Sequence, residues 1–391
     1  MIDKQQRKVY LEEKFHQLYG VAPHIWVQAP GRVDLMGSHT DYNLGYVLIQ
    51  AINRNTWIAA RPRTDNIVRI ASTNVADQAE FDLMNIQQAQ QAPWSNYVRG
   101  VADVFQKEKF NLTGFDGLIH STIPFGSGLS SSAALEVATA TLFETLGGWQ
   151  IDPLQKALLC QRAENEFVGM NCGIMDQYAS VMGRAGNVLL LDCRSLESVI
   201  KPIRADVQMM ICDTRAERQL IGTAYAQRRW ECETGVRVLS KYYPGIESLR
   251  DISLPQLNAH QKDLAPVVYR RCRFVLEENQ RVLDTADALA AGDSVTVGKR
   301  CVDSFEGARD LYEIVTPEMQ AMFDAIMSAP GALGARGAGA GFGGCLVAFI
   351  RPGSEDAFTA HVLQSYTKQT GIAAEVFPVE SADGAGMLIF D

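Results

Sequence analysis

The stretch STIPFGSGLSSSAALEVATATL, residues 121–142, constrains the fold of this chain more than any other. It places an apolar strand pattern, a turn rich in glycine and serine, and an alanine-rich helical pattern directly after one another. Such a turn exposes backbone N–H groups at the start of a helix, where the helix dipole and the unpaired donors suit a phosphate. Gly126 and Gly128 let the backbone come close, and the hydroxyls of residues 130–132 suit phosphate oxygens or Mg²⁺.

An ordinary turn is the competing interpretation of this stretch, because Gly and Ser also provide flexibility and helix capping. The turn lacks the Gly-Lys-Ser/Thr of a Walker loop, and its glycines do not follow the spacing G-x-G-x-x-G. The pattern therefore argues against a P-loop NTPase and a Rossmann dehydrogenase. It leaves phosphate binding and a plain turn equally open.

The length of 391 residues exceeds one ordinary core and indicates two domains. We place the division near residue 200, at KPIRAD, which gives domains 1–200 and 201–391. Strand patterns occur at HIWVQA, YVLIQAI, TWIAARP, IVRIAST, NVLLLDCRSLESVIKPI and VQMMICDT. Helical patterns occur at WSNYVRGVADVFQKEK, SSAALEVATATLFETLG and DPLQKALLCQRAENEFVG, and again from about residue 217 to 243 and 261 to 291. The predicted fold class is α/β (α+β), with a helix-rich second half.

The overall charge limits the partners of the protein. A formal net charge of −9 opposes a broad surface for nucleic acid. No apolar run approaches the roughly 20 residues that cross a bilayer, so we expect a cytoplasmic protein without a membrane segment. The eight cysteines are scattered and include no C-x-x-C pair, so we expect reduced core residues rather than disulfides or zinc ligands.

Two further segments carry residues that suit phosphoryl transfer. CQRAENEFVGMNCGIMDQYASVMG brings Glu164 on a helix and Asp176 near the start of another, and these carboxylates suit a metal and the attacking hydroxyl. A solvated acid and a helix N-terminal acid are the competing interpretations. GALGARGAGAGFGGCLVAFI, before and through a strand from Cys345, permits close approach to a ligand or, equally, tight interdomain packing.

The segment GRVDLMGSHTDYNLGYVL, from residue 31, completes a set of three motifs. It is similar to the galactokinase signature G-R-V-N-L-I-G-E-H-T-D-Y-N-x-G-x-V-L. PFGSGLSSSAA resembles the phosphate loop of the GHMP small-molecule kinases, and GARGAGAGFGGC resembles their C-terminal glycine motif. PWSNYVRGV, GMNCGIMDQYASVMG and AYAQRRWECE also resemble galactokinases, so the likeness runs from about residue 24 to the end.

This resemblance implies a two-domain GHMP kinase fold with the active site in the interdomain cleft. It implies an ATP-dependent sugar 1-kinase that needs Mg²⁺, acts on a small sugar as a monomer, and transfers the γ-phosphoryl group to the anomeric hydroxyl. Asp176 would take the proton of that hydroxyl or at least orient the hydroxyl, and Arg32 would hold Asp176 ionised. The implied sugar-binding residues are Arg32, Ser38, His39, Asp41, Gly173, Asp176 and Tyr225. The implied ATP-binding residues are Trp94, Tyr97, Gly126, Ser127, Gly128, Leu129, Ser130, Ser131 and Ser132, and the implied Mg²⁺ ligands are Ser132 and Glu164.

Two residues depart from the galactokinase signature. Asp34 stands in place of its asparagine, and Ser38 stands in place of the glutamate that the family places at the C6 end of the sugar. A shorter, uncharged residue at position 38 predicts weaker selectivity for a hydroxymethyl group. Galactose, L-arabinose and galacturonate therefore stay open as substrates. A non-catalytic sugar sensor is the less favoured alternative, because GLSSSAA is complete and Arg32, Glu164 and Asp176 are present.

Overall fold

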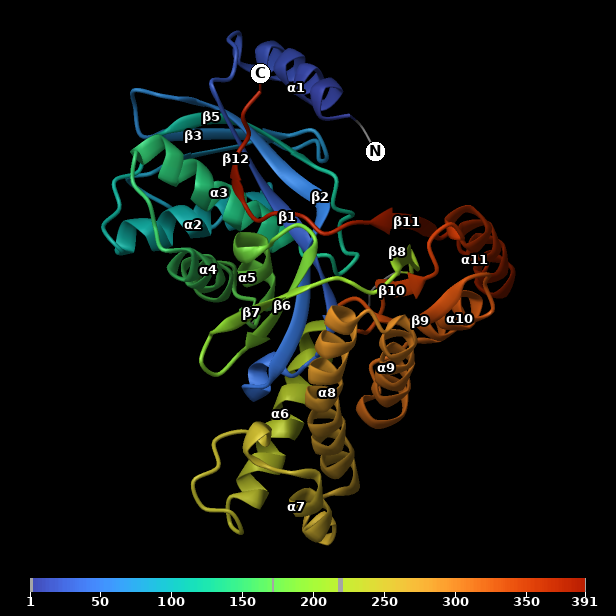
Figure 1. Cartoon of the computed structure of the whole chain (residues 1–391). Helices are drawn as coiled ribbons and strands as arrows, with labels where there is room; N and C mark the ends of the chain where they lie inside the picture. The colour runs from blue at the N-terminus through green and yellow to red at the C-terminus, as the bar shows by residue number, and fades with distance from the viewer. Residues whose placement is uncertain (1–2, 171, 217–220, 391) are drawn as a thin grey trace.

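Two sheets, one large and one small, organise the computed structural model, which describes residues 3–170, 172–216 and 221–390 (Figure 1). The strands are β1 (Ile25–Met36), β2 (Tyr46–Pro62), β3 (Ile67–Ser72), β4 (Ala79–Asp82), β5 (Phe115–Ser121), β6 (Asn187–Asp192), β7 (Ser198–Pro202), β8 (Gln208–Asp213), β9 (Ala332–Gly337), β10 (Cys345–Ile350), β11 (Glu375–Val379) and β12 (Gly386–Met387). The α-helices are α1 (Lys4–Tyr19), α2 (Asn96–Lys107), α3 (Ser131–Gly147), α4 (Pro153–Arg162), α5 (Met175–Met182), α6 (Ile221–Leu239), α7 (Leu254–Ala259), α8 (Pro266–Ala291), α9 (Ser294–Gly307), α10 (Pro317–Met327) and α11 (Glu355–Thr370). Two π-helical segments, η3 (Ala163–Val168) and η6 (Ala308–Tyr312), directly follow α4 and α9.

The large sheet is built around the first two long strands. Within the described residues its order is β12-β1-β2-β5-β3-β4, and β6 also pairs with β2 and with β7. β3 runs parallel to β5, while the other pairs are antiparallel. The patterns YVLIQAI and TWIAARP, predicted as separate strands, form the single strand β2, which pairs with β1 on both sides of a register shift between Pro30 and Arg32.

Helix α3 follows the candidate phosphate loop and is buried on most of its circumference. Its apolar residues, such as Val137 and Phe143, join the core that β1, β2 and β5 share with α2 and α4. A helix that is apolar all round requires partners on every side, which explains its central place in the N-terminal half (Figure 1). The loop before this helix is thereby attached directly to the core of the N-terminal half.

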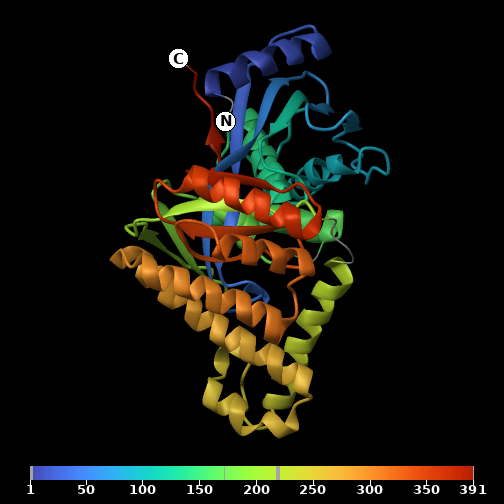
Figure 2. The ribbon, with the colours of Figure 1, turned by 90° about the vertical axis from the view of Figure 1, so that its right-hand side faces the viewer.

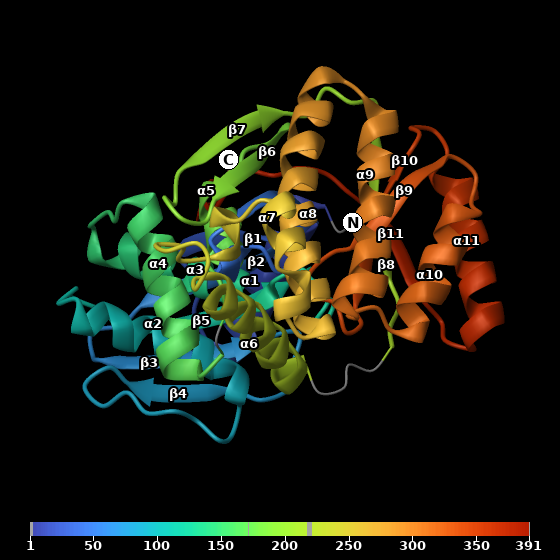
Figure 3. The ribbon, with the colours of Figure 1, turned by 90° about the horizontal axis from the view of Figure 1, so that it is seen from below.

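The small sheet is antiparallel throughout, in the order β11-β8-β10-β9. One of its faces packs on α10 and α11, which lie across it in Figure 2, through residues such as Leu346, Met322 and Phe358. Its other face contributes Val347 and Phe349 to a core that also contains residues of β1 and α8. Seen from below, α8 and α9 lie side by side between the two sheets (Figure 3).

Several boundaries differ from the sequence expectations. NVLLLDCRSLESVIKPI forms two paired strands, β6 and β7, rather than one strand pattern. The helix expected from about residue 261 begins at Pro266, since Pro is favoured in the first turn. The expected start of the preceding helix, at about residue 217, lies outside the described residues, and α6 is described from Ile221 to Leu239. The glycine-rich segment also forms a strand before Cys345, namely β9.

The C-terminal residues return to the N-terminal sheet. Met387 and Gly386 of β12 pair with Val27 and Gln28 of β1. The division into domains 1–200 and 201–391 therefore stays a prediction. The eight cysteines, all within the described part of the chain, form no disulfide, and all except the partly exposed Cys172 are buried. Among the described residues, none of the helices has the length and apolar character that would let it cross a membrane.

Candidate functional site

A cavity of about 600 Å³ lies where the first motif, the start of α5, helix α6 and the glycine-rich C-terminal segment meet. Every residue that the resemblance implies for sugar binding lines it: Arg32, Ser38, His39, Asp41, Gly173, Asp176 and Tyr225. Glu164 lines it as well. The fold thus brings together residues that are up to about two hundred positions apart in the sequence. We call this space the sugar cavity.

Arg32 and Asp176 form an ion pair at the loop side of the sugar cavity. Arg32, on β1, reaches Asp176 Oδ1 with Nε at 2.7 Å and Nη2 at 2.6 Å. The Ser130 hydroxyl donates to Asp176 Oδ2 at 2.5 Å. Asp176 lies in the first turn of α5, where the helix dipole favours a carboxylate. Both carboxylate oxygens are therefore held, and the side chain remains a quarter exposed toward the cavity.

The candidate phosphate loop holds Arg32 through its own backbone. The carbonyls of Gly128 and Leu129 accept from Arg32 Nη1 at 2.6 Å and from the Arg32 N–H at 3.2 Å. The Ser127 hydroxyl donates to the carbonyl of Pro124, and the Leu129 side chain is fully buried. For these two residues, only the backbone is available to a phosphate.

The glycine-rich C-terminal segment packs directly on this loop. A Cβ on Gly339 would lie 3.2 Å from the carbonyl oxygen of Gly128, so a larger residue would press on the loop. The N–H of Cys345 donates to the carbonyl of Ser127 at 3.0 Å. The sequence analysis left two interpretations open for this segment, close approach to a ligand and tight packing. Close backbone packing between distant parts of the chain is present. Gly339 and Ala340 of the same segment also line the sugar cavity.

Trp94 and Tyr97 lie in different surroundings. Trp94 lines a small, mainly apolar cavity of about 50 Å³ beside the loop, together with Phe125, Ser131 and Leu135. Its indole N–H is buried and has no hydrogen-bond partner within the described ranges. Tyr97 does not line this cavity. Burial raises the pKa of Tyr97 to about 12, and the carboxylate of Glu164 adds to the effect.

Glu164 belongs to a buried acidic cluster that the sequence analysis only partly identified. Gln177 Nε2 bridges Glu164 Oε2 at 2.6 Å and Glu136 Oε2 at 2.9 Å. Burial and then Asp176 raise the pKa of Glu164, and hydrogen bonds from Cys172, Ser132 and Gln177 oppose this rise. Glu136 was not recognised because it lies within the helical pattern of α3, where nothing in the sequence distinguishes a buried acid.

The oxygen atoms of Ser132 and Glu164 fit Mg²⁺ better than a transition metal. In the parts of the chain that the structure describes, three or more His, Cys, Asp or Glu side chains nowhere form a group that could hold a metal ion. Mg²⁺ is commonly bound by one or two carboxylates together with substrate phosphates and water. Ser132 and Glu164, joined by a hydrogen bond beside the loop, supply that smaller set.

Asp41 lines the sugar cavity as a partly buried carboxyl. Burial, with a further contribution from Asp176, raises the pKa of Asp41 to about 6. A Cβ on Gly173 would lie 1.8 Å from Asp41 Oδ2, so a larger residue there would displace the Asp41 carboxyl. Burial also raises the pKa of Tyr225 well above its usual range. Asp41 and Tyr225 thus offer an acceptor and a hydroxyl that are shielded from water, which suits a neutral polyol.

The ring of His39 is engaged on both nitrogens. Nε2 lies 2.8 Å from the carbonyl of Ala340 and must carry the proton, because a carbonyl only accepts. Nδ1 therefore accepts a hydrogen bond from the hydroxyl of Tyr42 at 2.8 Å. The hydroxyl oxygen of Tyr312 lies 2.8 Å from that of Tyr42. Burial lowers the pKa of His39 to about 4, which keeps the ring neutral. A sugar that bound a His39 nitrogen would have to displace one of these partners.

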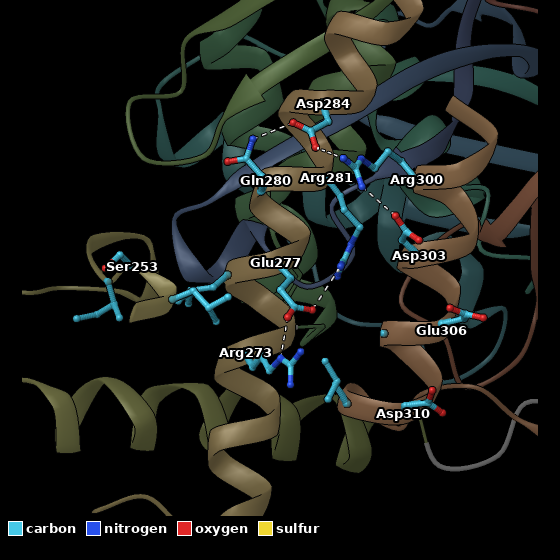
Figure 4. Close-up of a pocket in the computed structure, with 15 residues that line it drawn as sticks. Ser253, Arg273, Glu277, Gln280, Arg281, Asp284, Arg300, Asp303, Glu306 and Asp310 are labelled. Atoms are coloured by element: carbon cyan, nitrogen blue, oxygen red, sulfur yellow. Dashed lines mark hydrogen bonds and ion pairs between the residues drawn. The ribbon is translucent and has the colours of Figure 1, made fainter. Parts of the chain in front are cut away.

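A larger cavity, of about 830 Å³, lies between α8, α9 and the segment near residue 253 (Figure 4). None of the residues implied for sugar, ATP or Mg²⁺ lines it. Its arginines are paired within the cavity: Arg273 with Glu277 at 2.7 Å, and Arg300 with Asp284 and Asp303 at 2.9 Å each. We call this space the helical groove and do not assign the reaction to it.

Comparison with known protein families matches three parts of the chain. Residues 13–62 match the galactokinase galactose-binding signature, 96–184 the GHMP kinases N terminal domain, and 285–368 the GHMP kinases C terminal family. Among curated proteins, a galactokinase of Roseiflexus sp. (strain RS-1) is 44% identical over 379 residues, covering 97% of both chains. A galactokinase of Chloroflexus aurantiacus is 41% identical over 373 residues, covering 95% of both.

Solved structures agree with this assignment. A Lactococcus lactis galactokinase in complex with galactose superposes with a TM-score of 0.93 at 31% identity, over 97% of this chain and 99% of that one. The Methanococcus jannaschii mevalonate kinase superposes with a TM-score of 0.67 at 17% identity over 92% and 99%, which supports the fold alone. The mixed α/β, two-domain GHMP kinase fold expected from the motifs is confirmed. The chain is a sugar kinase and belongs to the galactokinase family of the GHMP kinases.

Proposed function

We propose that this protein transfers the γ-phosphoryl group of ATP to the anomeric hydroxyl of galactose and releases galactose 1-phosphate and ADP. The observation that carries the proposal is the arrangement of Arg32, Asp176 and Ser130, in which a carboxylate is fixed between the sugar cavity and the phosphate loop. A hydroxyl bound at Asp176 would lie beside any phosphate held by that loop. Positioning of this kind accounts for much of the catalysis of phosphoryl transfer.

Asp176 accepts the proton of the anomeric hydroxyl as its oxygen attacks the γ-phosphorus. Arg32 holds the Asp176 carboxylate in place through its two contacts and offsets negative charge on the transferred group. Ser130 directs Oδ2 by a hydrogen bond. Arg32 also donates to the carbonyl of Gly128. Movement of the loop on ATP binding would therefore shift Arg32 and, with it, Asp176.

The loop from Gly126 to Ser131 would hold the ATP phosphates through its N–H groups at the start of α3. The small cavity with Trp94 and Phe125 suits the adenine base, since it is mainly apolar and offers one buried indole donor without a partner among the described residues. Ser132 and Glu164 would hold Mg²⁺. When bound, that ion supplies charge stabilisation for the β- and γ-phosphates.

Galactose is favoured over L-arabinose and galacturonate because the closely similar curated relatives are galactokinases. The ionisable acids of the sugar cavity, among them Asp41 and Asp176, also disfavour a substrate that carries a carboxylate. We further propose that the protein acts as a monomer in the cytoplasm. The residues implied for the sugar come from a single chain, and unpaired cysteines suit a reducing compartment.

The test is a steady-state assay of ADP release with galactose, L-arabinose and galacturonate at saturating Mg²⁺-ATP. Phosphorus NMR of the product identifies the phosphorylated oxygen. We expect turnover with galactose and a phosphate on C1. Higher kcat/KM for either other sugar, or a phosphate on another carbon, would contradict the proposal. Binding of galactose without any turnover would indicate a sensor instead.

A further inference from the structure

The side chain of Gln177 joins three elements of the N-terminal half. From α5, its Nε2 donates to Glu136 Oε2 at 2.9 Å and to Glu164 Oε2 at 2.6 Å. Glu136 lies on α3 and Glu164 on η3. Glu136 and Gln177 are completely buried, and Glu164 is 6% exposed. Both N–H bonds of one amide are therefore used on carboxylates, and a single buried group links α3, η3 and α5.

Each of these three elements also carries one group of the proposed reaction. Ser132 precedes Glu136 by four residues on α3, which places both on one side of the helix. Asp176 directly precedes Gln177 on α5. Glu164 belongs to η3, a π-helical segment, and such segments occur frequently at functional sites. The amide of Gln177 thus fixes the two proposed Mg²⁺ ligands and the proposed proton acceptor relative to one another.

The link also determines how the carboxylate of Glu164 is oriented. Gln177 Nε2 lies 2.6 Å from Glu164 Oε2, and Cys172 Sγ lies 3.4 Å from the same oxygen. A hydrogen bond to a charged group is among the strong ones, so Oε2 is held in place. When one oxygen of a carboxylate is held, the other keeps a fixed direction. Glu164 Oε1 is therefore oriented by the protein before a cation binds.

Two oxygens of this link are left without a hydrogen bond. Among the residues that the structure describes, neither Glu136 Oε1 nor Gln177 Oε1 has a hydrogen-bond partner, and both atoms are buried. An unsatisfied buried polar atom is costly, whereas apolar side chains of the same shape can be neutral or stabilising. The pair of Glu136 and Gln177 is therefore a poor way to stabilise the fold.

We propose that Glu136 and Gln177 are positioning residues for Mg²⁺. Glu136 fixes the amide of Gln177, and Gln177 holds Glu164 in the orientation that binds the ion beside Ser132. Neither positioning residue lines the sugar cavity, and both are completely buried, so they act only through Glu164. The inference rests on the proposed function, which places the ion at Ser132 and Glu164. It makes the affinity for Mg²⁺ depend on Glu136, which no ligand reaches.

The experiment measures binding of AMP-PNP, a non-hydrolysable ATP analogue, by calorimetry at saturating galactose, once with Mg²⁺ and once with EDTA. The ratio of the two dissociation constants is the Mg²⁺ effect, and no turnover is needed to measure it. Gln177→Met and Glu136→Leu should each reduce the Mg²⁺ effect by about tenfold. The double variant E136L/Q177M should reduce it little further, because both residues act through one amide. Glu136→Gln, which keeps an oxygen that accepts from Gln177 Nε2, should retain it.

Thermal unfolding separates positioning from a structural role. The double variant E136L/Q177M should keep or raise Tm while it loses the Mg²⁺ effect, because it removes both unsatisfied oxygens. Gln50→Met is the matched control. Gln50 is buried on β2, its amide also lacks a hydrogen-bond partner within the described ranges, and it does not line the sugar cavity. This control should keep or raise Tm as well and leave the Mg²⁺ effect unchanged.

The outcomes distinguish the inference from the proposed function. An unchanged Mg²⁺ effect in both Gln177→Met and Glu136→Leu overturns the inference, and so does an equal loss in Gln50→Met. A loss of the Mg²⁺ effect that occurs only together with a lower Tm also overturns it, as does a wild type that binds AMP-PNP equally well with EDTA. A wild type that shows the Mg²⁺ effect but does not phosphorylate galactose would refute the proposed function alone.

Discussion

The sugar cavity and the helical groove are both large and charged, yet they differ in how their charges are satisfied. In the helical groove, arginines pair with carboxylates on the same helix or on the neighbouring helix (Figure 4). In the sugar cavity, burial and the neighbouring carboxylate of Asp176 both raise the pKa of Asp41, to about 6. The smaller cavity thus contains a carboxyl whose ionised form is disfavoured. Polar groups kept in an unfavourable state identify a functional site better than volume does.

The largest expected effect separates the two cavities by catalysis. Asp176→Asn should lower kcat by about 10²- to 10⁴-fold, because the amide keeps the shape but cannot accept a proton. Fluorescence binding of an ATP analogue should remain close to wild type. The matched change in the helical groove, Asp303→Asn, removes a charge paired with Arg300 and should leave kcat within about twofold. If Asp176→Asn retains more than about a tenth of the wild-type kcat, Asp176 is not the proton acceptor.

The second effect concerns stability. A folded pKa of about 6 for Asp41, against about 3.9 in the unfolded chain, means that ionisation in the folded state costs about 3 kcal/mol. This cost is small near pH 4, where the folded protein keeps Asp41 protonated, and it grows as the pH rises through about 6. Asp41→Asn should therefore stabilise the sugar-free protein by up to that amount at pH 7.5 and hardly at all at pH 4. Urea unfolding at both pH values tests this, and equal stabilisation at both would contradict it.

A smaller effect is expected at the Mg²⁺ position. Ser132→Ala removes one of the two proposed ligands and should raise the Mg²⁺ concentration required for half-maximal rate by about tenfold, a loss of about 1.4 kcal/mol. Thr145→Ala is the control, because its hydroxyl, on the same helix, donates to the carbonyl of Thr141 and has no other hydrogen-bond partner among the described residues. The assay is a Mg²⁺ titration at fixed ATP. Overlapping titration curves for the two variants would remove Ser132 from the metal site.

The smallest effect belongs to the helical groove. Arg273→Ala breaks an exposed pair with Glu277 one helical turn away and should change the free energy of unfolding by less than about 0.5 kcal/mol. The rate with galactose should stay the same. A change above about 2 kcal/mol, or a loss of activity, would show that the groove charges are not merely self-paired surface charges.

The sequence predicted the parts of the site that depend on local pattern. The strand, turn and helix around Gly126, the carboxylates of Glu164 and Asp176, and the three ordered motifs were identified from short stretches, and the structure brings them together. Local patterns report a turn or a helix cap because both depend on residues a few positions apart.

The buried hydrogen bond between Arg336 and Asp34 was not predicted, for a physical reason. Arg336, on β9, donates to the carbonyl of Asp34, on β1, at 2.6 Å, although the two residues are 302 positions apart in the sequence. In the sequence, Arg336 stood within a glycine-rich motif and was interpreted only as part of it. Glu136 was missed for the same reason. It lies in a helical pattern, and its hydrogen bond from Gln177 joins residues that are 41 positions apart.

The return of β12 to the N-terminal sheet has a consequence for biosynthesis. Until residues 386–387 have left the ribosome, the backbone of β1 around Val27 lacks its outer neighbour. An exposed strand edge invites pairing with other chains. The contact of the Ala382 N–H with the Ala51 carbonyl likewise forms only after residue 382 has emerged. The nascent N-terminal half therefore emerges with an open edge, and ribosome-bound chains stalled before this point should depend more on chaperones than chains that include β12.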